Sequence, residues 1–166
     1  MPIEIGFRDL YIPLVGTAEG ESDRAPLSTL DDDERSHVHG TLWIRVDGHD
    51  LPALGFFGPD DACLGSWAAE LHAAVAALEH ADPARHVFDE GEQGQPAFIF
   101  ERAGASVRIS LSASQYDSAC EPPPWPSQTC TLAGFVAEVR KFLASLDAVV
   151  RAAAPAGEGW LRGQLR

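Results

Sequence analysis

The stretch SHVHGTLWIRVDGHD, Ser36–Asp50, decides the fold class, because it has the pattern of an antiparallel β-strand and its turn. Leu42, Ile44 and Val46 alternate with more polar neighbours, as they would on a strand with one buried face. His37 and the residues that share its face are expected on the wetter side of the sheet.

Asp47–Gly48 is typical of a two-residue hairpin turn. Such a turn places Val46 opposite His49 and Arg45 opposite Asp50. This pairing makes chemical sense, because the two opposite charges meet on one face. The sequence therefore predicts a hairpin over residues 37–57 with this register.

Three histidines lie close together in this stretch, which raises the question of a metal site. In the predicted register His49 points to the opposite face from His37 and His39, so the three cannot share one ion. Zinc needs three or four protein ligands in most sites, and no neighbouring sequence supplies the missing ones. We therefore expect surface histidines, no bound metal and no cofactor.

Length and charge define the broad class. A chain of 166 residues is long enough for one ordinary core, so a single domain over residues 1–166 is expected. The formal net charge of −13 argues against nucleic acid or an anionic membrane as the main partner. The acidic excess lies before residue 138, where 22 acidic and 7 basic side chains occur.

The chain opens without a basic segment followed by an apolar one, and it has no apolar run of roughly 20 residues, so a cytoplasmic protein is expected. Cys63, Cys120 and Cys130 form no CxxC pair. We expect free thiols, although Cys120 and Cys130 bracket a proline-rich segment and would be able to pair in an oxidising compartment.

The remaining elements follow from periodicity and from turn residues. Asp60 or Asp61 is expected to cap the first helix, and Thr129 or Thr131 the last one. The predicted elements are a strand over 3–12, an acidic loop over 17–35 with a short helical turn near Leu27, a helix over 62–81, three strands within 85–116, a proline-rich loop over 120–130 around Trp125, a helix over 132–150 and a C-terminal tail over 155–166.

Helical stripes and hairpins together predict an α+β fold. We expect one antiparallel sheet of about five or six strands with both helices packed on one face. The last helix has the clearest stripe, formed by Leu132, Phe135, Val136, Val139, Phe142, Leu143, Leu146 and Val150.

No catalytic motif is recognisable. The chain has no GxGxxG or Walker loop, and CLGSW, residues 63–67, is not a nucleophile elbow. The run Asp31–Glu34 lacks the alternating spacing of a calcium loop. Trp125 lies outside any apolar periodicity, so it either covers an edge of the core or serves as an aromatic anchor for a partner.

The layout from His37 to Val150 resembles small bacterial α+β immunity proteins that are encoded beside polymorphic toxins. GTLWIRVDG leads into a helix, AFIFERAGASVRISLSA follows, and a long C-terminal helix ends the segment. The resemblance implies a protein that binds and silences a toxin and has no catalytic residues of its own. The EPPPWPSQTC segment and the three cysteines fall outside this pattern.

We therefore expect a non-catalytic protein that binds a basic protein partner, with oligomeric state left open. A structural or adaptor domain of a bacterial assembly is an alternative. A small enzyme or ligand binder that uses His37, His39 and Arg45 is a further one. The expected partner-binding residues are Asp31, Asp32, Asp33, Glu34, Asp60, Asp61, Asp89, Glu90, Glu92 and Trp125.

Overall fold

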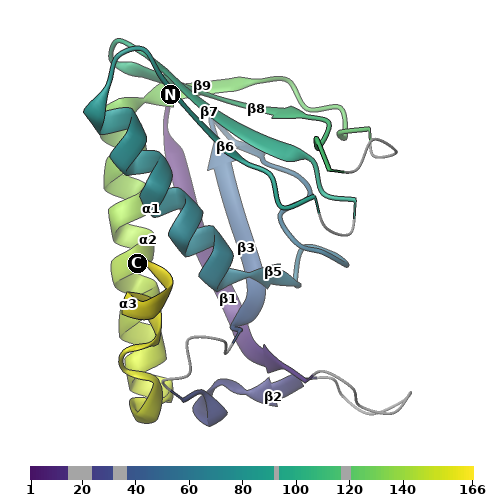
Figure 1. Cartoon of the computed structure of the whole chain (residues 1–166), viewed down its shortest axis with the longest axis vertical. Helices are drawn as coiled ribbons and strands as arrows, with labels where there is room; N and C mark the ends of the chain where they lie inside the picture. Colours follow the sequence, from purple (N-terminus) through teal and green to yellow (C-terminus); the bar gives the residue numbers. More distant parts are fainter. Residues whose placement is uncertain (15–23, 32–36, 92–93, 117–120) are drawn as a thin grey trace.

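The computed structural model describes residues 1–14, 24–31, 37–91, 94–116 and 121–166. Within these ranges the chain forms two antiparallel sheets and three α-helices, as Figure 1 shows. The expected α+β class is confirmed. The strands are divided between a five-stranded and a four-stranded sheet, whereas a single sheet of five or six strands was expected.

The first sheet contains the predicted hairpin. Asp47 and Gly48 have φ angles of 51° and 81°, and Val46 and His49 are paired across the turn, so the predicted register is confirmed. The second arm is shorter than the expected hairpin over 37–57, because pairing ends at Asp50. The strands are β1 (Ile3–Pro13), β2 (Arg24–Pro26), β3 (His39–Val46), β4 (His49–Asp50) and β5 (Ala62–Cys63), in the order β2-β1-β3-β4 with β5 also paired to β3.

The second sheet contains the three strands expected within 85–116. It also contains a strand that was not predicted. Gln128–Cys130 lies within the predicted proline-rich loop over 120–130, but it pairs with Val107 and its neighbours. The strands are β6 (Ala84–Phe88), β7 (Ala97–Ala103), β8 (Ser106–Ser112) and β9 (Gln128–Thr131), in that order across the sheet.

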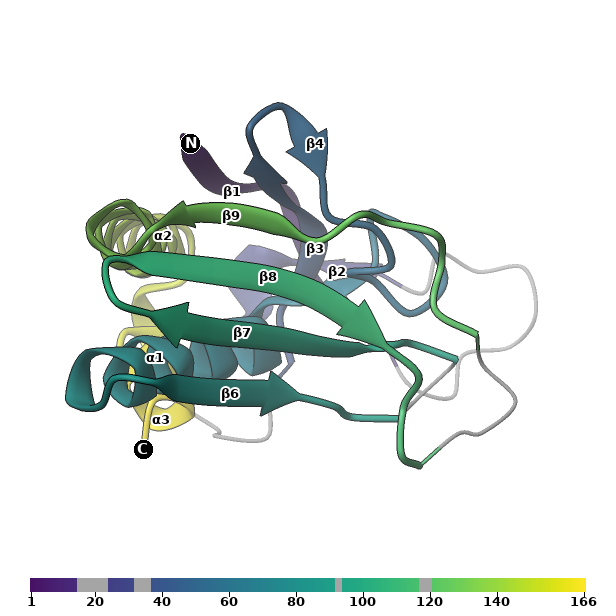
Figure 2. The same cartoon turned by 90° about the horizontal axis from the view of Figure 1, so that it is seen from above.

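Both long helices pack against the first sheet and against each other. They are α1 (Leu64–His80) and α2 (Leu132–Ala153). Seen from above in Figure 2, the second sheet lies across the end of α1 and the beginning of α2. The apolar stripe of α2 is buried as predicted except at its margins, since Leu132 and Leu143 are only half-buried.

Of the two predicted helix caps, the one for α2 is confirmed and the one for α1 is wrong. The Thr131 hydroxyl accepts a hydrogen bond from the Gly134 amide at 3.1 Å, so the expected cap of α2 is confirmed. The cap of α1 is Cys63, which makes no side-chain capping bond. Asp60 and Asp61 precede it and bind other groups instead.

The C-terminal segment is ordered structure and not an extended tail. It forms a short turn, η2 (Pro155–Gly157), and α3 (Trp160–Gln164), which packs against α1. Trp160 is only 1% exposed, so it belongs to the core. The predicted turn near Leu27 is also present, as η1 (Leu27–Thr29). Among the described residues, no helix is both long and apolar enough to cross a membrane.

Candidate functional site

The structure describes only part of the set of expected acidic binding residues. Asp32, Asp33, Glu34 and Glu92 lie outside the described residues. The Asp31 carbonyl lies near Gly157, beyond the end of α2, whereas Figure 1 shows the loop before β5 on the opposite side of the molecule.

Trp67 contacts two of the segments that carry expected acidic residues, the loop before β5 and the end of β6. Its indole Nε1 donates to the Leu54 carbonyl at 2.9 Å, in the loop that leads to Asp60. Its ring meets Phe88, the residue before Asp89, with 4.8 Å between centroids. Leu54, earlier in the loop that contains Asp60, and Phe88, next to Asp89, therefore contact the same buried side chain.

Trp125 packs against the core. It is half-buried, and its indole Nε1 is a buried donor without a hydrogen-bond acceptor in the described structure. This placement matches a residue that covers an edge of the core. A role as an aromatic anchor for a partner stays a prediction.

A cluster of polar side chains that the sequence did not predict lies where β1, β3 and β5 meet. His39 is paired with Cys63 on one side and with Tyr11 on the other. Tyr11 reaches this face because β1 has a bulge after Arg8, with Asp9 at a φ of 55°, and the extra residue reverses the alternation of side chains. His39 is 8% exposed, so the expectation of a surface histidine is wrong for this residue.

Asp61 joins the cluster through two short hydrogen bonds. One carboxylate oxygen accepts from the Tyr11 hydroxyl at 2.7 Å and lies 2.7 Å from His39 Nδ1. The carboxylate therefore favours the His39 tautomer with hydrogen on Nδ1, and the other ring nitrogen, Nε2, is left for the hydrogen bond with Cys63. This is the role of Asp61 in place of helix capping.

The cluster changes the ionisation of Cys63. Burial by itself would raise the pKa of the thiol, but hydrogen bonds from His39, Ser66 and His37 outweigh burial and lower this pKa to about 6. The position of Cys63 at the start of α1 acts in the same direction, because a helix N-terminus stabilises a thiolate. Burial lowers the pKa of His39, yet Cys63 and Asp61 together raise it above its ordinary value. A thiolate beside a protonated imidazole is thus favoured near neutral pH.

Alkylation should separate the two described cysteines by pH. In protein dialysed against a chelator, we expect the rate of Cys63 modification by iodoacetamide to rise with a midpoint near pH 6, because the thiolate is the reactive form. Both thiols are buried, but burial raises the pKa of the Cys130 thiol to about 11, so Cys130 should stay unmodified up to pH 9. Peptide mass spectrometry measures each site, and the Ser66→Ala variant should shift the Cys63 midpoint upward. A midpoint above pH 8 would contradict the proposed hydrogen-bond network.

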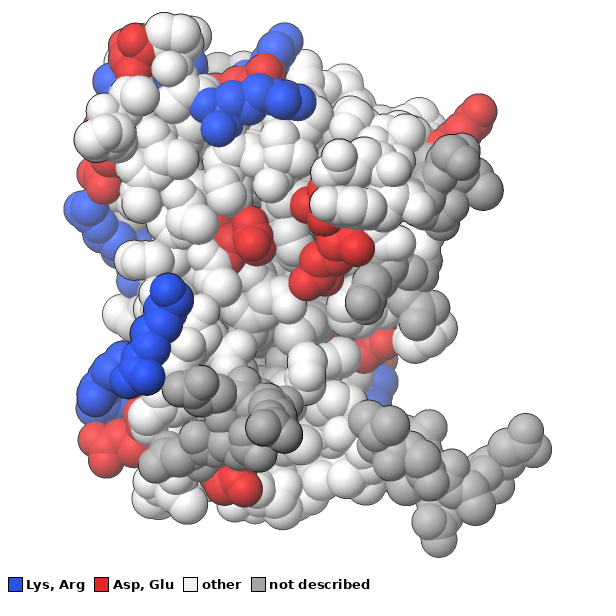
Figure 3. Space-filling view, viewed as in Figure 1, with Lys and Arg blue, Asp and Glu red and all other residues white. Residues whose placement is uncertain are grey.

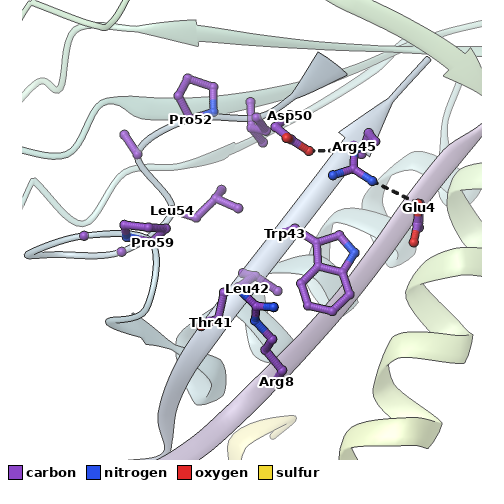
Figure 4. A pocket seen from close by; sticks show the side chains of 14 residues that line it. Glu4, Arg8, Thr41, Leu42, Trp43, Arg45, Asp50, Pro52, Leu54 and Pro59 are labelled. Atoms are coloured by element: carbon purple, nitrogen blue, oxygen red, sulfur yellow. Dashed lines mark hydrogen bonds and ion pairs between the residues drawn. The ribbon is translucent and has the colours of Figure 1, made fainter. Parts of the chain in front are cut away.

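A hollow of about 660 Å³ lies on the same face of the first sheet, beginning at Thr41, two residues from His39. Figure 4 shows Trp43, Arg8 and Arg45 on its floor and the loop with Leu54 and Pro59 along its rim. The Arg45 guanidinium lies 2.7 Å from Asp50 and 3.6 Å from Glu4, so its charge is largely compensated. His39 and Cys63 do not line this hollow.

The sequence concealed this cluster for a specific reason. His37 and Cys63 are 26 residues apart, and their contact depends on a two-residue strand without any periodic signal. The only local sign was the pair of histidines two residues apart on one strand face. No neighbouring sequence supplies a third ligand, but the fold brings Cys63 beside the two histidines.

Comparisons with known protein families, with curated proteins and with solved structures found no match for this chain.

Proposed function

We propose that this protein is a non-catalytic, acidic binding protein of the bacterial cytoplasm that inhibits a basic protein partner, in the manner of an immunity protein. The observation that carries the proposal is the formal net charge of −13 in 166 residues. Complementary charge speeds the encounter with a basic protein and rejects acidic ones. A toxin domain whose site meets nucleic acid or phosphate has the surface that would suit this charge.

The ion pairs of the described structure support this reading. Most arginines lie within 4 Å of a carboxylate, so they do not create a basic region of their own. The excess of acidic over basic residues therefore makes the electrostatic potential around the molecule negative. The paired cations are Arg8, Arg24, Arg45, Arg85, Arg102, Arg108, Lys141, Arg140 and Arg151.

The segments around Asp60 and Asp89 are the best candidate contact region. Both lie in loops: Asp60 is paired with Arg24 at 2.9 Å, and Asp89 follows Phe88, which packs on Trp67. A rigid scaffold that presents loops is a common arrangement for binding. Figure 3 shows acidic side chains in the middle of the face that carries α1, with Lys and Arg mostly toward its upper and left margins. These acidic side chains give a basic partner complementary charge on this face.

The test is the association rate with the product of the adjacent gene, measured by surface plasmon resonance. Neutralising Asp60, Asp89 and Glu90 to their amides should lower the on-rate more than it raises the off-rate, because long-range attraction acts on encounter. The matched control neutralises the same number of charges at Glu138, Asp147 and Glu158, near the C-terminal helices. Equal on-rates for the two variants would count against the proposed contact region.

A second candidate function rests on the buried cluster and the hollow beside it. A cysteine with a lowered pKa next to a histidine and a carboxylate is an arrangement that enzymes also use for nucleophilic catalysis. Turnover of a thioester or ester substrate that disappears in the Cys63→Ala variant would favour this candidate. Stable association with a structural assembly, without inhibition, would favour the adaptor alternative.

A further inference from the structure

The side chains of His37, His39 and Cys63 are of the types that bind metal ions. A metal site formed by them does not depend on the proposed binding of a protein partner. His37 lies two residues before His39, the first residue of β3, and Cys63 ends β5. One ligand atom of each residue lies within 4.8 Å of the other two. Two imidazoles and a thiolate are borderline-to-soft ligands, which favour zinc over magnesium or calcium.

One of the three distances between ligand atoms already fits zinc, and the others, within 4.8 Å, would have to shorten around the ion. For Zn–S of about 2.3 Å and Zn–N of about 2.0–2.1 Å, a tetrahedral site puts nitrogen and sulfur about 3.6 Å apart. His37 Nδ1 lies 3.7 Å from the Cys63 sulfur. His37 is the exposed member of the three, so its ring has room to adjust around an ion.

The surroundings of His39 also match those of a zinc ligand. Ligating histidines almost always donate their second ring N–H to a carboxylate or carbonyl, which fixes the tautomer and the orientation of the ring. Asp61 accepts from His39 Nδ1 at 2.7 Å, and Tyr11 holds the same carboxylate oxygen. His39 Nε2 is then the ring nitrogen on the side of Cys63, and an ion bound between the two residues would replace their hydrogen bond. The Ser66 hydroxyl lies 3.5 Å from the Cys63 sulfur and supports the thiolate.

We propose that His37, His39 and Cys63 bind one zinc ion, with Asp61 as the carboxylate that orients His39. Three protein ligands leave a fourth position for water or for a group from a bound molecule, and this is the pattern of open zinc sites. The exposed side of His37 gives solvent access to that position. The proposal goes beyond the proposed function, because an inhibitor with or without zinc would still carry the acidic surface.

The test uses the full chain purified without an affinity tag, incubated with zinc sulfate and passed through a desalting column. We expect one zinc per chain by mass spectrometry of the metal. Substitution with cobalt should give the visible absorption bands of a tetrahedral site together with a sulfur-to-cobalt charge-transfer band. The Asp61→Asn variant should bind zinc about 10- to 100-fold more weakly in competition with a chromophoric chelator.

Two variants remove ligands and two serve as controls. Cys63→Ser should abolish the charge-transfer band, and His37→Ala should abolish stoichiometric zinc without threatening the fold, because His37 is exposed. His49→Ala and Cys130→Ser remove the same residue types outside the cluster and should leave binding unchanged. Absence of stoichiometric zinc in the unmodified chain, or zinc retained by His37→Ala, would overturn the proposal.

Discussion

Replacing Trp67 with alanine should lower the free energy of unfolding by about 3–5 kcal/mol, the range for removing a large aromatic side chain from a core. Trp67 is 2% exposed. Its ring packs edge-on against Phe88 and Phe98, each with 4.8 Å between ring centroids. The change also removes the donor to the Leu54 carbonyl, which connects the loop before β5 to α1.

Urea denaturation followed by far-ultraviolet circular dichroism measures this loss. Trp67→Phe keeps an aromatic ring and removes the indole donor, so it should be less destabilising than the alanine variant. Val87→Ala changes a side chain that is 38% exposed in β6 and should alter stability by less than about 0.5 kcal/mol. Similar losses for Trp67→Ala and Val87→Ala would show that Trp67 does not occupy the core as described.

Replacing Phe142 with alanine in α2 should have an effect of the same size, about 3–5 kcal/mol. Phe142 is 1% exposed and meets Phe7 of β1 edge-on, with 5.8 Å between ring centroids. This contact holds the long helix against the first sheet. Denaturant melts of the purified variant measure the change.

The matched controls, Leu143 and Ser145, follow this position in α2. Ser145→Ala, at an exposed site, should change stability by less than about 0.5 kcal/mol. Leu143→Ala should fall between the two, because Leu143 is half-buried. If Ser145→Ala costs as much as Phe142→Ala, the face that α2 presents to the core is assigned wrongly.

Local patterns predicted the elements that obey them. The stripe around Phe142 predicted α2, and Asp47–Gly48 predicted both the turn and its register. These signals succeed because hydrophobic periodicity and turn chemistry act over a few neighbouring residues. The division into two sheets depends on how distant strands pair, and no local pattern encodes that.

The buried cluster was hidden for the same reason. Cys63 and His39 become neighbours only through the two-residue pairing of β5 with β3. Tyr11 joins them because of one extra residue in β1, which reversed the face that simple alternation assigns to it. Asp61 was predicted to cap a helix. A carboxylate can equally bind a histidine, and the sequence does not distinguish the two roles.

Growth of bacteria that express the adjacent gene product, with and without this protein, tests the central claim most directly. We expect the adjacent product alone to arrest growth and co-expression of this protein to restore it, with the two chains purifying together. Rescue should weaken when Asp60, Asp89 and Glu90 are neutralised and persist when Glu138, Asp147 and Glu158 are. An adjacent product that is harmless alone, or that remains toxic when this protein is abundant, would contradict the claim that this protein is an inhibitor.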